Sequence, residues 1–186
     1  MKKIYISCYE NNDMSFKQAI IDLNKKRNNC LFELINSSES EIENEFLSLN
    51  NNEESFIHRI RNKYLRDADV MILLVGLETK KRKTIDWELR AAMSQTNLFS
   101  KSGILIVYLP EIIERFGAKI PRSILPNILL KNINTKDTFI VETIYSRLFK
   151  QFSYIEKCIN VSYAYGQMSK YDVDESIKKN DDSNLF

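Results

Sequence analysis

The chain has 186 residues, of which 44% are hydrophobic, and this is enough for one domain with a sizeable core. Its 27 basic and 25 acidic side chains leave a formal charge of only +2, so composition gives no field for binding nucleic acid or an anionic membrane. No apolar run is long enough to span a membrane, and the first residues lead directly into a strand pattern, so we expect a cytoplasmic protein. The three cysteines are widely spaced without ligand patterning, so we expect neither a disulfide framework nor a metal site.

The first part of the chain alternates strand patterns with helical patterns. Residues 3–8 and 30–35 are rich in β-branched and aromatic side chains and predict strands. Between them, helical spacing predicts a helix that Asp13 caps and that ends in a basic turn. A short helix should follow the second strand, and a helix with a more regular apolar spacing should occupy about residues 53–65. This alternation is typical of parallel sheets covered by helices.

The central part of the chain contains the most informative stretch. Residues 70–75 are continuously apolar, as in a strand buried on both faces, and Gly76 ends the run. The next helix should begin near Thr84, which we expect as its N-cap. Trp87 and Glu88 fall off the apolar row of that helix. Because ligands bind beyond the carboxyl ends of strands in open α/β sheets, we look for chemistry here.

The last part of the chain completes the predicted fold. Residues 104–109 form a second fully apolar run and predict another buried strand. Residues 111–130 read as loops with a short helix and an edge strand, and residues 139–159 read as one long helix. We therefore predict an α/β fold with a doubly wound, mainly parallel sheet of about five strands in three layers. The domain should span residues 1–160, followed by a partly disordered or weakly helical extension at 161–186.

Two segments resemble a known family. Residues 73–82 read Leu-Leu-Val-Gly-x-x-Thr-x-x-Arg, and residues 86–89 read Asp-Trp-Glu-Leu. Together with the opening Lys-Ile-Tyr-Ile-Ser-Cys-Tyr-Glu-Asn-Asn-Asp at residues 3–13, they resemble the TIR-like domains of bacterial antiphage defence, particularly the Thoeris type. The resemblance spans roughly residues 2–130 and implies a flavodoxin-like, TIR-like fold. Family members often carry a second tryptophan at the position of Thr84, which this chain lacks.

The resemblance implies an enzyme that cleaves the nicotinamide–ribose bond of NAD and makes a cyclic or linear ADP-ribose signal. NAD is then the substrate, and no cofactor or metal is expected. One carboxylate suffices, because nicotinamide leaves a pyridinium as a neutral molecule and needs no acid to protonate it. Glu88 is the candidate catalytic residue, stabilising an oxocarbenium-like ribose. The residues expected to contact the substrate are Ser7, Cys8, Tyr9, Asn36, Ser37, Gly76, Thr79, Arg82 and Trp87.

Alternatives remain for these residues and for the function. Glu88 can simply complement the dipole of its helix, Trp87 can be a core or interface aromatic, and Arg82 can belong to a solvated loop. Cys8 has no histidine partner at a motif spacing, which excludes a thiol nucleophile, and no glycine-rich phosphate loop is present. The rival functions are a non-catalytic adaptor that assembles through residues 139–159 and a nucleoside deoxyribosyltransferase. The resemblance further implies a homo-oligomer, a separate effector that senses the product, and a phage protein as the trigger.

Overall fold

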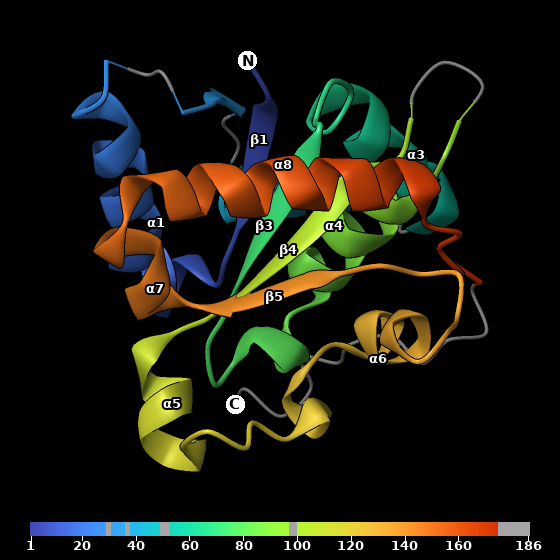
Figure 1. Ribbon diagram of the computed structural model, residues 1–186. Helices are drawn as coiled ribbons and strands as arrows, with labels where there is room; N and C mark the ends of the chain where they lie inside the picture. Colours follow the sequence, from blue (N-terminus) through green and yellow to red (C-terminus); the bar gives the residue numbers. More distant parts are fainter. Residues whose placement is uncertain (29–30, 36–37, 49–52, 97–99, 175–186) are drawn as a thin grey trace.

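A five-stranded parallel sheet forms the centre of the protein (Figure 1). The computed structural model describes residues 1–174 except 29–30, 36–37, 49–52 and 97–99. The strands lie in the order β2-β1-β3-β4-β5, and every neighbouring pair is parallel. They are β1 (Lys3–Ser7), β2 (Glu33–Ile35), β3 (Val70–Val75), β4 (Gly103–Tyr108) and β5 (Val141–Ile144).

In the part of the chain that the structure describes, helices connect successive strands, and two further helices follow β5. They are α1 (Glu10–Lys25), α2 (Glu39–Ser48), α3 (Glu53–Lys63), α4 (Lys83–Met93), α5 (Pro110–Phe116), α6 (Asn127–Ile133), α7 (Tyr145–Lys150) and α8 (Phe152–Met168). Two 3₁₀ turns, η1 (Thr79–Lys81) and η2 (Arg122–Ile124), precede α4 and α6. None of the described helices has the length and apolar character that crossing a bilayer requires.

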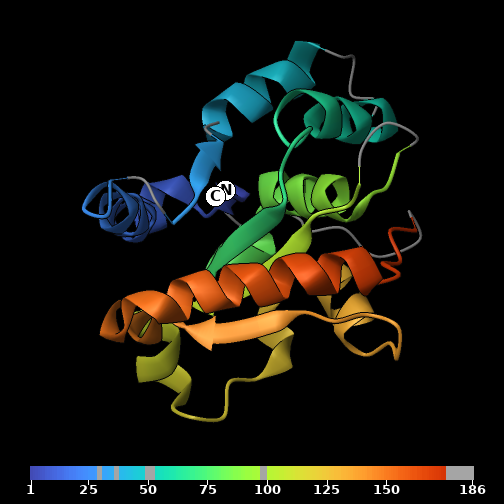
Figure 2. The same ribbon diagram turned by 45° about the horizontal axis from the view of Figure 1, so that its top comes forward.

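The sheet is covered by helices on both faces (Figure 2). One face packs against α2, α3, α4 and α6, and the other packs against α1, α7 and α8. Alternate side chains of β1 divide accordingly, with Tyr5 in the first core cluster and Ile4 and Ile6 in the second. β3 and β4 are buried at every position, as their uninterrupted apolar runs predicted. The predicted three-layer, doubly wound α/β fold is confirmed.

Two predicted elements in the last third of the chain are wrong. Residues 139–159 do not form one helix, because Val141–Ile144 pairs with β4 as an edge strand before α7 and α8 follow. Pairing with β4 outweighs the helical spacing of the apolar side chains. The edge strand predicted within residues 111–130 is instead the short helix α6 with the turn before it.

α8 continues through residue 160, where the sequence predicted the end of the domain. It lies across the face of the sheet against β4 (Figure 1). Beyond it, Tyr171 and Val173 pack against the core cluster of the opposite face, on which α4 and α6 lie. Within the predicted extension, the Asp172 amide donates to Asn132, and the Asp174 carbonyl accepts a bond from Arg90. Residues 175–186 lie outside the described part of the chain.

The strand order reverses at the centre of the sheet. The chain passes outward from β1 to β2 and then returns to β3 on the other side of β1. The loops that leave the carboxyl ends of β1 and β3 consequently diverge, and such a switch point is where ligands bind in open α/β sheets. The residues that follow Ser7 and Val75 therefore border the expected site.

Candidate active site

Glu88 lies in α4 and faces β1. Its Oε1 accepts a hydrogen bond from the Tyr5 hydroxyl at 2.5 Å, and its Oε2 accepts one from the Ser7 hydroxyl. Tyr5 and Ser7 are two residues apart in one strand, so their side chains lie on the same face of the sheet. The residue is 5% exposed. The carboxylate is therefore held in one orientation by two hydroxyl groups near the carboxyl end of β1.

The helix that carries Glu88 begins earlier than predicted. α4 starts at Lys83 with Arg82 as its N-cap, so the prediction of Thr84 as the cap is wrong. Glu88 is then the sixth helical residue, whereas Asp86 is the acid of the first turn. Because the dipole effect falls off within the first turn, complementing the dipole does not explain Glu88. Its hydrogen bonds to β1 are the stronger local interactions.

Trp87 is a core residue in this structure. Its ring lies 4.5 Å from that of Phe46 and 5.0 Å from that of Phe56, measured between ring centroids. It is 4% exposed and belongs to the same core cluster as Leu89, so it does not turn away from the apolar row of the helix as predicted. The geometry favours the core alternative over stacking on a substrate.

The loop after β1 brings three predicted site residues together with Arg82. Ser7 and Cys8 are buried, and Tyr9 is the N-cap of α1, in place of the predicted Asp13. The Arg82 guanidinium carbon lies 3.5 Å from the centre of the Tyr9 ring. Arg82 is the N-cap of α4 and is partly exposed. Its positive charge therefore lies between the start of α4 and the loop after β1.

Cys8 is a poor nucleophile in this setting. Burial raises the pKa of its thiol to about 12, and the nearby positive charge of Lys17 offsets that only in part. The thiol is therefore protonated at neutral pH, and only the thiolate attacks or binds metal. The structure agrees with the exclusion of thiol catalysis.

Gly76 and Thr79 build the turn that follows β3. The Gly76 amide donates to Thr79 Oγ1 at 2.8 Å, and that hydroxyl donates to the Leu74 carbonyl at 3.4 Å. A Cβ atom at Gly76 would lie 2.7 Å from Glu111 Oε1 and 3.0 Å from both carboxylate oxygens of Asp13. A side chain at Gly76 would require the carboxylates of Glu111 and Asp13 to shift. Gly76 and Thr79 thus shape the second loop of the switch point.

The structure brings most of the predicted site residues to one edge of the sheet. Ser7, Cys8 and Tyr9 follow or end β1, Gly76 and Thr79 follow β3, and Arg82 and Glu88 come from the N-cap and second turn of α4. The predictions for Asn36 and Ser37 fall outside the described residues. Tyr5 was missed, although its position two residues before Ser7 in a strand indicated that both side chains share a face.

No metal centre is found among the residues that the structure describes, since these contain no group of three or more histidine, cysteine, aspartate or glutamate side chains placed to hold an ion.

A protein-family model described as "Thoeris protein ThsB, TIR-like domain" matches residues 5–112. This range covers more than half of the chain and runs from β1 through β4 into α5. The chain belongs to the ThsB TIR-like family. No curated protein and no solved structure shows significant similarity to it. The ThsB TIR-like match includes Glu88, both of its hydroxyl donors and the two loops of the switch point.

Proposed function

We propose that the protein consumes NAD, cleaving the bond between nicotinamide and ribose with Glu88 as the catalytic carboxylate. The observation that carries the proposal is the carboxylate of Glu88, fixed by Tyr5 and Ser7 at the switch point of a ThsB TIR-like fold. A fixed anion placed where positive charge develops is an effective way to stabilise a transition state.

The reaction does not need a second acidic group to protonate the leaving group. The bond between C1′ of the ribose and the pyridinium nitrogen breaks, and its electron pair goes to that nitrogen, so nicotinamide departs as a neutral molecule. The ribose carbon becomes an oxocarbenium-like cation. The oxygens of Glu88 accept hydrogen bonds from Tyr5 and Ser7 of β1, and a carboxylate oxygen can accept more than one hydrogen bond, including one from a ribose hydroxyl. Glu88 can thus orient the ribose and stabilise the cation without leaving its place.

The nucleophile decides the product. Attack by water, with loss of its proton, gives linear ADP-ribose, whereas attack by a hydroxyl or ring nitrogen of the same nucleotide gives a cyclic product.

Arg82 supplies a cation at the rim of the Tyr9 loop and suits the diphosphate of NAD. We further propose that the product is a signal in antiphage defence, sensed by a separate effector, and that a phage protein triggers synthesis in a homo-oligomer.

The test compares wild-type protein with Glu88→Gln, which keeps the shape of the side chain and removes its charge. Nicotinamide release from NAD should fall by about 100-fold or more. Glu114→Gln, at an exposed position of α5, is the matched control and should keep wild-type turnover. The assay is run with purified protein and in phage-infected cells. Equal NAD loss with wild type and Glu88→Gln, or intact NAD with wild type in both settings, means the enzymatic proposal is wrong.

The same assay separates the rival functions. A nucleoside deoxyribosyltransferase would exchange bases between deoxynucleosides and leave NAD intact. A non-catalytic adaptor would leave both substrates intact. The segment first considered for such an adaptor, residues 139–159, is divided between β5, α7 and α8, so it offers no single helical surface for assembly.

A further inference from the structure

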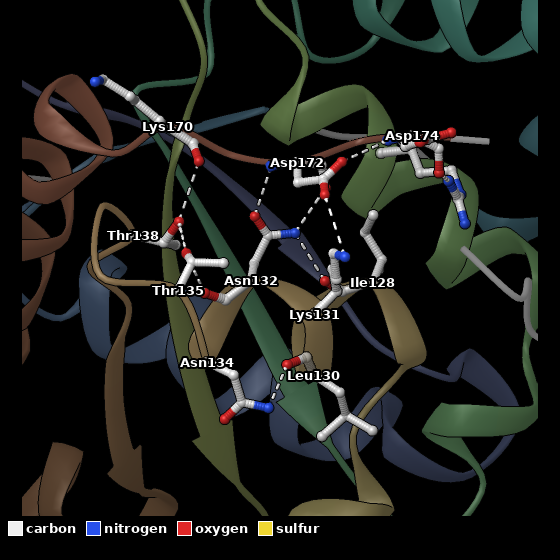
Figure 3. Close-up of polar contacts among 11 residues, drawn as sticks. Ile128, Leu130, Lys131, Asn132, Asn134, Thr135, Thr138, Lys170, Asp172 and Asp174 are labelled. Carbon is white, nitrogen blue, oxygen red and sulfur yellow. Dashed lines mark hydrogen bonds and ion pairs between the residues drawn. The ribbon is translucent and has the colours of Figure 1, made fainter. Parts of the chain in front are cut away.

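The last described residues, 169–174, here called the C-terminal segment, are tied to α6 through Asn132 (Figure 3). Asn132 is fully buried. Its Nδ2 donates to the Asp172 carbonyl at 2.8 Å, and its Oδ1 accepts from the Asp172 amide at 2.8 Å. The same Nδ2 donates to the Ile128 carbonyl within α6 at 2.8 Å. One side-chain amide thus pairs with both backbone groups of Asp172, as a neighbouring strand would.

Further bonds hold the start of the C-terminal segment to the loop before β5. The Lys170 amide donates to the Asp137 carbonyl at 2.8 Å. Thr138 Oγ1 donates to the Lys170 carbonyl at 3.2 Å (Figure 3). The Phe139 amide donates to Ser169 Oγ at 2.9 Å. The C-terminal segment is therefore bonded along its length rather than lying loosely on the surface.

The other end of the C-terminal segment contacts α4. Arg90 Nη1 donates to the Asp174 carbonyl at 3.2 Å, while its Nε donates to Asp86 Oδ2 at 2.7 Å. The side chains of this ion pair are 2% and 1% exposed. A buried ion pair is stable only if its surroundings remain closed and its polar atoms keep their partners. The C-terminal segment contributes one of those partners.

Asp86 and Arg90 lie on the opposite side of α4 from Glu88. They are two residues before and two residues after it, which is about 200° around a helix of 3.6 residues per turn. Glu88 bonds to β1 on one side of α4, and Arg90 bonds to the C-terminal segment on the other. The helix is therefore fixed from two sides, and every residue from Thr84 to Met93 is buried.

We propose that the C-terminal segment is a positioning element of the active site, fixing the rotation of α4 and thereby the place of Glu88. The proposal rests on the function proposed above. Arg90 and Asn132 act through α4 and are positioning residues. Asn132 and the C-terminal segment lie outside residues 5–112, which the family model matches. This chain thus completes its catalytic helix with residues that follow the TIR-like core.

The experiment compares Asn132→Ala with Asn134→Ala in the full chain. Asn134 is the matched control, because it is exposed and donates only a local bond to the Leu130 carbonyl at 2.9 Å (Figure 3). Hydrogen–deuterium exchange, at a temperature where both variants are folded, should show the amides of α4 exchanging about tenfold faster in Asn132→Ala, with β3 and β4 unchanged. The kcat for NAD should fall about tenfold, with KM within about twofold of wild type. Asn134→Ala should match wild type in both measurements.

The outcomes separate the two proposals. Equal exchange of α4 in both variants overturns the positioning role, whatever the NAD assay gives. Faster exchange of α4 with unchanged kcat overturns it as well. A wild-type protein that leaves NAD intact overturns the proposed function, and the exchange of α4 then decides alone whether the C-terminal segment fixes the helix. If Asn132→Ala does not fold, Thr138→Val takes its place. This change removes the bond to the Lys170 carbonyl together with the bond that Thr138 accepts from the Thr135 hydroxyl. Exchange of α4 no faster than in Asn134→Ala then overturns the proposal.

Discussion

Two opposing effects act on the charge of the Glu88 carboxylate. It is almost fully buried, which disfavours a charge, and it accepts hydrogen bonds from two hydroxyl groups, which favour one. Tyr5 and Ser7 are therefore part of the active site, because their hydroxyl groups keep the Glu88 side chain in one rotamer. They also replace the hydrogen bonds to water that the carboxylate loses on folding. A bond to a buried charged group contributes more than one between neutral groups.

We expect Tyr5→Phe to lower kcat for NAD about tenfold while KM changes little, because one oxygen of Glu88 loses its donor. The unfolding free energy should fall by about 1–3 kcal/mol for the same reason. Steady-state kinetics and urea unfolding measure the two effects. Tyr163→Phe, in α8 on the other face of the sheet, is the control and should leave both values unchanged. Wild-type kcat in Tyr5→Phe would show that this hydroxyl does not orient the carboxylate.

The sequence predicts the positions and contacts of some site residues but not of others. Glu88 and its loops were found because the motif at residues 73–89 resembles a known family and lies where the sheet topology places ligands. The bond from Tyr5 to Glu88 joins residues 83 apart in the chain, so only the packing of α4 on β1 reveals it. Trp87 was misplaced because helical spacing does not show that α2 and α3 cover the outer side of α4.

Among the elements, α8 and β4 pack with their backbones in direct contact. A Cβ atom at Gly103 would lie 1.9 Å from the Ser162 carbonyl oxygen, and one at Gly166 would lie 2.5 Å from the Gly103 Cα. A glycine inside a helix costs about 1 kcal/mol relative to alanine. The close approach explains why Gly166 is nevertheless present, since it lets α8 lie directly on a central strand.

Gly103→Ala should therefore lower the unfolding free energy by about 3 kcal/mol or more, because the new methyl group meets the backbone of α8. Gly166→Ala should also destabilise the fold despite its better helix propensity. Urea unfolding followed by circular dichroism measures both. Ala164→Ser, on the exposed side of the same helix, serves for comparison and should change stability by less than about 0.5 kcal/mol. A Gly103→Ala protein as stable as wild type would contradict the backbone contact.

Strands were predicted correctly where the pattern of apolar residues matches the burial of the strand in the fold. β3 and β4 are apolar at each position because both faces of a central strand are covered. β5 was missed because it is four residues long, lies at an edge and carries apolar side chains at a spacing that also fits a helix. Its identity is decided by β4, a partner more than 30 residues earlier, and no local pattern reports such a pairing.

For the whole molecule, charge acts through local clusters rather than through the small net charge of +2. The clearest cluster joins α2 to α3, where Glu45 accepts bonds from Arg59, from Lys63 at 2.8 Å and from the Tyr64 hydroxyl at 2.7 Å. Burial raises the pKa of Glu45, but the hydrogen bonds from Lys63, Tyr64 and Arg59 outweigh burial and lower that pKa to about 2. This cluster therefore couples the stability of the fold to pH.

The folded pKa of Glu45 lies below its ordinary value of 4.5, so its contribution to stability is present above pH 4.5 and is lost as pH falls towards 2. Glu45→Gln should lower the unfolding free energy at pH 7 by about 1–2 kcal/mol, a figure reduced because Arg59 and Lys63 are half exposed to screening water. Urea unfolding between pH 7 and pH 2.5 measures the difference between wild type and Glu45→Gln, which should shrink below pH 4.5. Glu114→Gln should show no comparable difference at any pH. A difference that stays constant down to pH 2.5 would mean that shape, and not the charge of Glu45, holds α2 against α3.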